Sequence, residues 1–394
     1  MFLQDPIHGY IELEGFELDI LDTKHFQRLR RVKQLGFTNL VYPSATHTRF
    51  EHSIGAKNLA EKFAKYLEVS EQESKELRAA SMLHDIGHGP FSHTSEKVFA
   101  KKDFSHEDFS VEKIRGETVS DALNKNGISP DKVVSLIRGE GELGQIIAGD
   151  IDVDRMDYLM RDAHYSGVAH GVIDAETIMR AAKFKEGKLV FGHKFKQALE
   201  GLLTARYLMT PTVYMHEGVI RAEKMMERAI EELISYEELN VRDLSDMDDV
   251  DLKARLRSTG SERANYLNSL LDTRDVFKTC YRLDAEEVGR EKILEVIDEL
   301  GEENKVEKEL SEALGVSEKK LLVDKPFKPK KKKIGIWLEK KGGLVSLEEE
   351  SKVCRAINES HWENVALQVY CPRNSSKEFE KPVKNFFENK LGVA

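Results

Sequence analysis

The sequence is poor in cysteine and has no long apolar run. Its three cysteines, Cys280, Cys354 and Cys371, lie far apart and lack the spacing of a zinc knuckle. This pattern argues against a disulfide framework and favours a reducing compartment. No segment approaches the roughly 18 apolar residues that a membrane span needs. The N-terminal MFLQDPIHGY has neither the basic nor the apolar region of a signal peptide. We therefore expect a cytoplasmic protein without a membrane partner.

The chain also lacks an excess of positive charge, because its formal net charge is −10. An anionic ligand must therefore meet a local basic patch rather than a basic protein. The one strongly cationic run, KPFKPKKKK (325–333), is typical of a solvated linker, and a nucleic-acid partner is not favoured. Twelve of the thirteen histidines lie within residues 1–216, so chemistry that needs imidazole belongs to the first part of the chain.

Helical periodicity dominates the sequence and predicts a mainly α fold. An alternating segment, YIELEGFELDI (10–20), is typical of a hairpin arm. The acidic stretch NVRDLSDMDDVDL (240–252) fits either a loop or the start of a helix. Near the end, IGIWL (334–338) and VALQVYC (365–371) are typical of strands. We predict a helical catalytic core over 1–235, a helical extension over 236–324, and a small α+β lobe over 325–394 that follows the basic linker. Within these parts, the apolar spacing predicts helices over 22–35, 52–67, 70–86, 105–124, 129–138, 143–162, 174–184, 197–236, 261–278 and 284–300.

The stretch SMLHDIGHGPFSH (81–93) gathers histidines and an aspartate at the end of an apolar segment. On a regular helix His84 and Asp85 would point about 100° apart, but a fraying last turn can bend both toward one point. A mixed imidazole and carboxylate set suits a borderline divalent metal such as Mn, Fe, Zn or Co. His52 and one of four nearby aspartates, Asp150, Asp152, Asp154 or Asp157, could complete such a set. An HD dipeptide alone is more often a surface pair, and a lone histidine is more often a core residue.

Several motifs in a fixed order resemble one family. They are DPIHGYIEL (5–13), LDTKHFQRLRRVKQLG (21–36), YPSATHTRFEHSIG (42–55), LHDIGHGPFSH (83–93), SHEDFS (105–110) and DVDRMDYLMRDAHYSG (152–167). Together they resemble the HD-domain metal phosphohydrolase superfamily, and within it the deoxynucleoside triphosphate (dNTP) triphosphohydrolase branch, which includes the sterile-alpha-motif/HD-domain enzymes and bacterial dGTPase-like proteins. The resemblance covers residues 1–230, and no sterile-alpha-motif domain is recognised in this sequence.

The resemblance implies a single divalent ion bound by His52, His84, Asp85 and Asp154. The ion would be Mn, Fe, Zn, Co or Ni, with Mg as an alternative that accompanies the nucleotide. It implies an enzyme that hydrolyses dNTPs to a deoxynucleoside and tripolyphosphate. His106 would be the general acid, with Glu107 or Asp108 to orient it, and His93 a phosphate-side residue. His88 would be either catalytic or a support for the metal site.

The resemblance also implies substrate contacts. Arg49, Arg155 and Arg206 would bind phosphates, Gln34, Leu35, Tyr158 and Asp162 would surround the sugar, and Tyr214 would lie near the base. Each arginine could instead be an ordinary surface residue, and Tyr158 a core aromatic. Tyr158 and Asp162 are spaced to share one helical face, which suits a filter against the ribose 2′-hydroxyl.

A regulatory site is a further implication of the family. Asp22, Gln27 and Arg30 fit positions that read an activating nucleotide, GTP or a dNTP, with Arg180 and Lys194 on its phosphate side. Such allosteric enzymes are homo-oligomers, dimers or tetramers. Met1 and Glu217 stand where the family has basic residues, which leaves activation open. The alternative is that Asp22 caps a helix while Gln27 and Arg30 lie on the surface. Two other functions stay open: another HD-type nucleotide phosphohydrolase or phosphodiesterase, and a non-enzymatic nucleotide- or nucleic-acid-binding scaffold.

Overall fold

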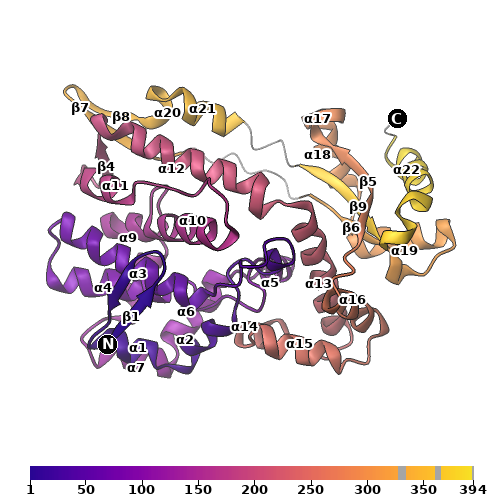
Figure 1. Cartoon of the computed structure of the whole chain (residues 1–394), viewed down its shortest axis with the longest axis horizontal. Helices are drawn as coiled ribbons and strands as arrows, with labels where there is room; N and C mark the ends of the chain where they lie inside the picture. The colour runs from indigo at the N-terminus through magenta and orange to yellow at the C-terminus, as the bar shows by residue number, and fades with distance from the viewer. Residues whose placement is uncertain (327–333, 360–364, 393–394) are drawn as a thin grey trace. The chain divides into compact units, whose positions relative to one another are not determined.

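The computed structural model describes residues 1–326, 334–359 and 365–392. It is mainly helical with small sheets, which confirms the predicted fold class (Figure 1). Most of the basic run 325–333 lies outside the described residues. The contacts divide the chain into two compact units, the first of residues 1–213, 241–252 and 333–357 and the second of residues 214–240, 253–332 and 358–394. The predicted three-part division at 235 and 324 stays a prediction.

The first unit is a helical core with a hairpin and a four-stranded sheet. Its first half contains β1 (Phe2–Asp5), β2 (Gly9–Glu12), α1 (Phe16–Leu21), α2 (Lys24–Arg28), the 3-10 turns η1 (Leu29–Arg31) and η2 (Thr38–Leu40), α3 (Arg49–Tyr66), α4 (Glu71–Leu83), α5 (His93–Ala100), α6 (His106–Arg115), α7 (Glu117–Asn124), α8 (Pro130–Ile137) and α9 (Gly141–Ala148). Its second half contains α10 (Val153–Ser166), α11 (Ala175–Ala181), β3 (Ala182–Lys185), β4 (Lys188–Gly192), η3 (His193–Phe195), α12 (Lys196–Met209), α14 (Val241–Asp246), β7 (Trp337–Lys340), β8 (Gly343–Ser346) and α20 (Leu347–Glu350). The strands follow the order β3-β4-β7-β8, and β7 joins by parallel pairing with β4.

The second unit packs helices on a three-stranded antiparallel sheet of order β5-β9-β6. Its core includes Leu310, Leu367, Val369 and Phe387, all fully buried. The elements are α13 (Glu217–Ser235), α16 (Glu262–Asp272), β5 (Lys278–Asp284), α17 (Ala285–Val288), α18 (Arg290–Glu299), α19 (Glu303–Leu314), η5 (Glu318–Lys320), β6 (Leu322–Asp324), β9 (Ala366–Cys371), η7 (Arg373–Ser375) and α22 (Ser376–Leu391). Three elements lie at the borders of the units: the π-helix η4 (Thr210–Tyr214), α15 (Asp249–Arg257) and α21 (Lys352–Glu359).

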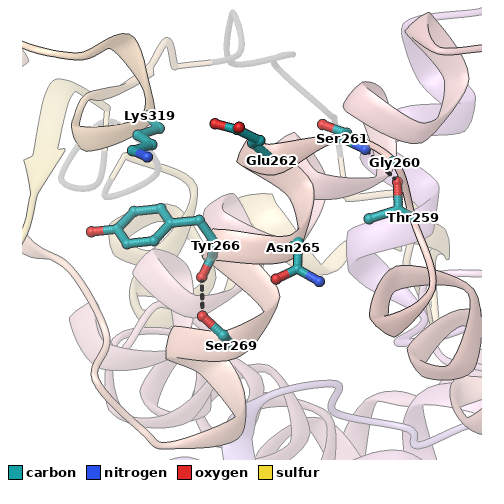
Figure 2. Close-up of a pocket in the computed structure, with 8 residues that line it drawn as sticks. All are labelled: Thr259, Gly260, Ser261, Glu262, Asn265, Tyr266, Ser269 and Lys319. Atoms are coloured by element: carbon teal, nitrogen blue, oxygen red, sulfur yellow. Dashed lines mark hydrogen bonds between the residues drawn. The ribbon is translucent and has the colours of Figure 1, made fainter.

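A shallow pocket of about 410 Å³ lies beside α16 in the second unit (Figure 2). Glu262, Asn265, Tyr266 and Lys319 are among its lining residues. It contains no histidine or cysteine, so the imidazole chemistry expected from the sequence lies elsewhere.

Two paired helices form the centre of the first unit. Leu59 and Phe63 on α3 and Leu77 and Ala80 on α4 are buried, as the apolar spacing predicts, and α3 and α4 pack against each other. Ser70 accepts a hydrogen bond from the Glu73 N–H, which fixes the start of α4 as a capping box. No helix in the described ranges is both long and apolar enough to cross a bilayer.

The structure corrects several predictions of local structure. The helices predicted over 143–162 and 197–236 are each broken into two. The alternation over 10–20 is not a hairpin arm to its end, because the positive φ of Gly15 ends the hairpin and α1 follows. The helix predicted over 22–35 stops as an α-helix at Arg28, whose guanidinium donates to the carbonyl oxygens of Ile86 and His88 at 2.8 and 2.7 Å. The helix predicted over 261–278 ends at Asp272, and β5 begins at Lys278.

Candidate metal centre

His52 lies in the first turn of α3 and is fully buried. The Glu51 side chain accepts a hydrogen bond from the Thr48 N–H at 2.8 Å, one half of the capping box at this helix start. Because this box fixes where α3 begins, it also fixes which direction His52 faces.

His84 and Asp85 occupy the turn that follows α4. His84 is the last, half-helical residue, and the chain leaves the helix immediately afterwards. Gly87 is required two residues on, because a Cβ there would lie 2.2 Å from the His106 carbonyl oxygen and 2.3 Å from the Ser110 nitrogen. The glycine therefore lets this turn pack directly against the start of α6.

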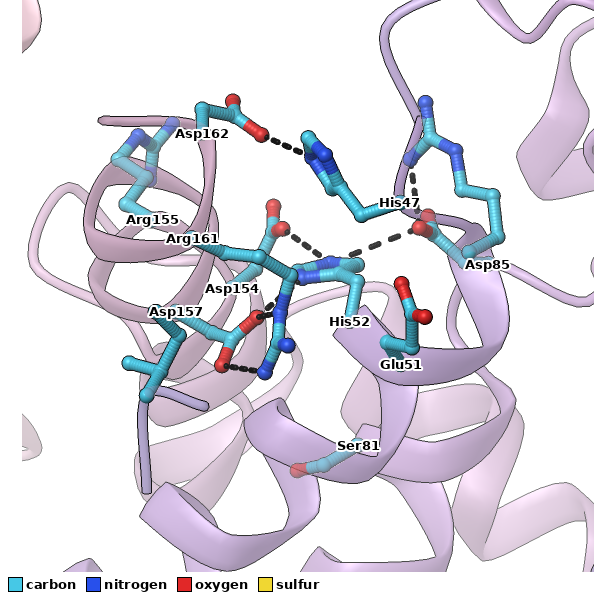
Figure 3. Close-up of polar contacts among 12 residues, drawn as sticks. His47, Glu51, His52, Ser81, Asp85, Asp154, Arg155, Asp157, Arg161 and Asp162 are labelled. Carbon is cyan, nitrogen blue, oxygen red and sulfur yellow. Dashed lines mark hydrogen bonds and ion pairs between the residues drawn. The ribbon is translucent and has the colours of Figure 1, made fainter. Parts of the chain in front are cut away.

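Four side chains from three segments converge at this point, and Figure 3 shows three of them, His52, Asp85 and Asp154. The Nε2 atoms of His52 and His84 are 3.2 Å apart. Asp154 Oδ1 lies 3.1 Å from His52 Nε2 and 3.6 Å from His84 Nε2. Asp85 places one oxygen 3.5 Å from His52 Nε2 and the other 3.4 Å from His84 Nε2. The structure thus brings together all four residues that the sequence singled out.

The Nδ1 atoms of His52 and His84 point away from the cluster and have hydrogen-bond partners. These partners decide the protonation of the Nε2 atoms, which point into the cluster. His52 Nδ1 donates to Asp157 Oδ2 at 2.9 Å, and His84 Nδ1 donates to the Ser81 carbonyl oxygen at 2.8 Å. When Nδ1 carries the proton, Nε2 carries a lone pair. Two lone pairs 3.2 Å apart, flanked by two carboxylates, fit a shared divalent cation.

The electrostatics of the cluster favour positive charge. Burial lowers the pKa of His52, but its bonds with Asp154 and Asp157 outweigh this effect and raise that pKa to about 10. Burial and the Asp85 carboxylate oppose each other in the same way at His84, and the net effect raises its pKa. For Asp154, the two imidazoles overcome the opposing effect of burial and lower its pKa.

Asp157 orients His52 and belongs to a buried network below the cluster. Its Oδ1 atom lies 2.6 Å from His8 Nε2, and Arg161 donates to both of its oxygens at 2.9 and 3.0 Å. Arg161 also donates to Asp5 at 2.7 Å. Gly55 on α3 makes room for the network, because a Cβ there would lie 1.9 Å from Asp157 Oδ1.

His88 and His106 form a stacked pair beside the cluster, with ring centroids 4.0 Å apart. His88 Nε2 lies 3.3 Å from Asp85 Oδ1, and His106 Nδ1 lies 3.0 Å from Glu96 Oε2. Burial, together with Arg49 and His106, holds the pKa of His88 well below its usual value. Burial acts the same way on His106, but Glu96 outweighs it and raises the His106 pKa. The two pKa values are thus shifted in opposite directions, a division that suits a general acid beside a metal-site support.

The partner of His106 differs from the one expected from the sequence. Ser105 is the N-cap of α6, and Asp108 completes the capping box by accepting from the Ser105 N–H at 2.9 Å, so its carboxylate is engaged away from His106. Glu96 on α5 does so instead. His93 is the first residue of α5 and is exposed.

Arg49 lies directly against the cluster and is buried. Its Nη1 donates to Asp85 at 2.5 Å and its Nε donates to Ser92 Oγ at 2.9 Å. Arg155 instead donates to Asp152 and to the Gly149 carbonyl oxygen on its own side of α10.

The residues expected around the sugar lie on α10 and on the segment before α3. Asp162 is buried, and its Oδ1 accepts from His47 Nε2 at 2.8 Å. Gln34 is also buried, and within the described residues its side-chain oxygen has no hydrogen-bond partner. Tyr158 is half-buried, one turn before Asp162. The other expected substrate residues are the buried Leu35, the exposed Arg206 on α12, and Tyr214, which begins the second unit.

The candidate regulatory residues lie on the surface with local partners. Asp22 is the exposed C-cap of α1, while Thr23 caps α2. Arg30 donates to Gln27 at 2.9 Å, and its guanidinium lies 3.5 Å from the Phe50 ring centroid. The remaining two also have neighbours: Arg180 donates to Glu176, and Lys194 lies over the Phe195 ring. Arg30 is exposed, as the surface alternative expects, whereas Gln27 is half-buried and donates to the Leu21 carbonyl oxygen at 2.9 Å. A regulatory role for the set stays a prediction.

Sequence reasoning did not identify His8, Asp157 and Glu96 as parts of the centre. His8 stands in the DPIHG motif, and Glu96 follows His93 by three residues on α5, so both carried a signal. Asp157 was one of four candidate aspartates, and the structure distinguishes it from Asp154 because Asp157 contacts His52 Nδ1, whereas Asp154 contacts the Nε2 atoms of both imidazoles.

Comparison with protein families gives two matches that together cover most of the chain. The HD domain matches residues 49–162, and the HD associated region matches residues 173–391. The first match begins at Arg49 and ends at Asp162, so it encloses the four converging residues.

Individual relatives agree with this result. An uncharacterized protein of Methanocaldococcus jannaschii is 35% identical over 384 residues, which is 96% of this chain and 81% of that protein. The deoxynucleoside triphosphate triphosphohydrolase SAMHD1 homologue of Dictyostelium discoideum is 36% identical over 58% of this chain, and the match spans 49% of its own length. A crystal structure of a phosphohydrolase from Bacteroides thetaiotaomicron superposes with a TM-score of 0.75 at 25% identity, over 95% of this chain and all of that one.

Proposed function

Because the chain belongs to the HD-domain phosphohydrolase family, we propose that it hydrolyses deoxynucleoside triphosphates to a deoxynucleoside and tripolyphosphate. The observation that carries this proposal is the position of the His106–Glu96 pair and of Arg49 around the four converging ligands. Relatives that are named as dNTP triphosphohydrolases support the choice of substrate.

His52, His84, Asp85 and Asp154 would hold one divalent ion. When bound, this ion supplies Lewis-acid polarisation of the phosphoryl group. Asp157 and the Ser81 carbonyl keep both imidazoles in the tautomer that a ligand needs. Which of Mn, Fe, Zn, Co, Ni or Mg is bound would be read by elemental analysis.

The remaining groups act on the substrate directly. A water molecule gives up one proton to solvent as its oxygen forms the new bond to the α-phosphorus, and the bond between that phosphorus and the sugar O5′ breaks. His106 is the proton donor to O5′, because Glu96 raises its pKa. Arg49 neutralises phosphate oxygens next to Asp85, with His93, Arg155 and Arg206 as further phosphate-side candidates.

Sugar recognition would rest on α10. Asp162 accepts one hydrogen bond from His47 through Oδ1, and the carboxylate has further acceptor capacity for a 3′-hydroxyl. The Tyr158 ring would occupy the space of a ribose 2′-hydroxyl, and Gln34 would contribute its buried side-chain oxygen. We propose Tyr214 as the base-side residue. We also propose that the enzyme works as a homo-oligomer that GTP or a dNTP activates.

The test is to incubate the purified protein with Mn²⁺ and each dNTP, with and without GTP, and to identify the products by anion exchange. Tripolyphosphate must appear, and His84→Ala must abolish it. His170→Ala is the matched control, because His170 is an exposed histidine of the same unit and its loss should leave the rate unchanged. Phosphate or pyrophosphate as product would identify another HD-type nucleotide phosphohydrolase or a phosphodiesterase. Nucleotide binding that survives His84→Ala without any turnover would identify a scaffold.

A further inference from the structure

The acidic segment 240–252 has no role in the site described so far. Except for its first residue it belongs to the first unit, although the chain on both sides of it belongs to the second. Its helix α14 lies beside α5 (Figure 1). Two of its aspartates form ion pairs with the helical core, Asp246 with Lys113 and Asp248 with Arg31. In addition, the Met247 carbonyl oxygen accepts from Arg28 at 2.6 Å.

A third aspartate of this segment makes a different kind of contact. Asp249 is 7% exposed and binds backbone rather than a cationic side chain. Its Oδ1 accepts from the Phe91 N–H at 2.7 Å, and its Oδ2 accepts from the Lys33 N–H at 3.3 Å. One carboxylate therefore ties the turn between α4 and α5 to the segment that precedes Gln34.

The turn that Asp249 holds is strained. Phe91 and Ser92 have φ angles of 55° and 44°, in the left-handed region that residues with a Cβ rarely adopt. Two consecutive residues persist in such a conformation only where the surroundings hold them. Both are buried, so the Phe91 N–H would have no solvent partner if Asp249 were removed.

Ser92 connects this turn to the metal centre. Its hydroxyl donates to the Lys33 carbonyl oxygen at 2.7 Å and accepts from Arg49 Nε at 2.9 Å. Arg49 in turn donates to Asp85. A continuous path of hydrogen bonds thus runs from Asp249, through Lys33 and the Phe91–Ser92 turn, to the guanidinium of Arg49.

We propose that Asp249 is a positioning residue that sets the orientation of Arg49 toward the phosphates, acting through the Phe91–Ser92 turn. This inference rests on the proposed function, because it assumes that Arg49 binds substrate phosphate. Burial disfavours the ionised Asp249 carboxylate, and the two N–H donors offset this effect only partly, so the pKa of Asp249 is raised to about 6. The buried carboxylate is therefore not a favourable group at this position in itself.

Three variants separate the steps of this path. Asp249→Ala removes both acceptor oxygens, and Asp249→Asn keeps one carbonyl oxygen for the Phe91 N–H. Asp246→Ala is the matched control, because it removes an aspartate of the same segment that pairs with Lys113 on α6 and not with the turn.

The first measurement is hydrogen exchange of the Phe91 amide, which needs no catalysis. It should exchange at least about tenfold faster in Asp249→Ala, because a hydrogen bond to a charged acceptor is lost, and at the wild-type rate in Asp246→Ala. Unchanged protection in Asp249→Ala would overturn the first step of the path.

The second measurement compares binding of tripolyphosphate to the Mn²⁺-loaded protein with KM and kcat for the dNTP that the wild type hydrolyses best. In Asp249→Ala the dissociation constant and KM should both rise about tenfold, kcat should change less, and Mn²⁺ affinity should stay at the wild-type level. Asp249→Asn should recover part of the loss, and Ser92→Ala should add little to Asp249→Ala because both act on Arg49.

Two results would overturn the inference: equal losses in Asp246→Ala, or a loss of Mn²⁺ affinity that accounts for the whole effect. A wild-type protein that neither hydrolyses a nucleotide nor binds tripolyphosphate would refute the proposed function instead. Exchange at Phe91 would then still decide whether Asp249 holds the turn.

Discussion

Replacing Asp157 with asparagine should test whether Asp157 orients His52 for metal binding without binding the ion itself. Asp157 does not point at the shared cation position, since its oxygens are occupied by His52 Nδ1, His8 and Arg161. Asparagine preserves the shape but removes the charge, and one of its two side-chain atoms becomes a donor that faces other donors.

The expected loss has two parts. Arg161 is fully buried and would keep only Asp5 as a charged partner, at 2.7 Å. Breaking a buried ion pair costs about 3–5 kcal/mol of folding free energy, and the remaining Asp5 places this variant near the lower end. The partners that orient metal ligands contribute about 10–100-fold in affinity, so Mn²⁺ binding should weaken by about 1.4–2.8 kcal/mol.

Urea unfolding of the protein in EDTA measures the first part, and calorimetric titration with MnCl₂ measures the second. Asp154→Asn is the comparison. The Asp154 side chain is 35% exposed and contacts the two imidazoles rather than a guanidinium. This variant should lose Mn²⁺ binding and change stability by about 1 kcal/mol or less. Should folded Asp157→Asn protein bind Mn²⁺ as tightly as the wild type, Asp157 does not orient His52 and the reasoning fails.

Three further results are expected. Because the pKa of His52 is raised to about 10 and that of His84 is raised as well, Mn²⁺ must displace at least one proton at pH 7, so affinity should rise about tenfold or more per pH unit below the pKa of His52. Calorimetry in buffers of different ionisation enthalpy would detect the released protons, and pH-independent binding would contradict the assignment. Tyr158→Ala should reduce the preference for dGTP over GTP by about tenfold or more, whereas Tyr158→Phe should retain it. Glu96→Gln removes the group that raises the His106 pKa, so His106 should lose its proton at a lower pH. The alkaline limb of the pH profile of kcat should then move to lower pH, with KM little changed. An unmoved limb would exclude His106 as the general acid.

Local patterns predicted the elements that carry the ligands. The S-x-x-E box before α4 and the glycines after it fixed where that helix begins and ends, so the position of His84 and Asp85 at a helix terminus followed from the sequence. The pattern could not show that α2 ends at Arg28 and passes into the 3-10 turn η1, or that the Arg28 guanidinium donates to the carbonyl oxygens of Ile86 and His88, 58 and 60 positions away. Helical periodicity does not encode such long-range contacts.

The contacts that hold the site in place were mostly invisible in the sequence. Asp249 reaches Phe91 across 158 positions, and His8 reaches Asp157 across 149. No periodicity encodes such a pairing, and an aspartate in an acidic stretch is expected to be solvated. The contact between Glu96 and His106 was missed as well, because it joins two different helices, α5 and α6.

Charge balance links the metal centre to the network beneath it. Four carboxylates, of Asp5, Asp85, Asp154 and Asp157, and two guanidiniums, of Arg49 and Arg161, form a connected set of ion pairs around His52 and His84. Asp85 and Asp154 contact both imidazoles, and Asp157 contacts His52. A divalent ion makes this buried set neutral, and two protons on the imidazoles do the same, which is why the pKa values of His52 and His84 are both raised. A monovalent ion would leave a net negative charge next to an incoming triphosphate. This set therefore favours a divalent over a monovalent ion. We propose that an arriving nucleotide finds its counter-charges outside the set, at His106 and at the arginines of α10 and α12.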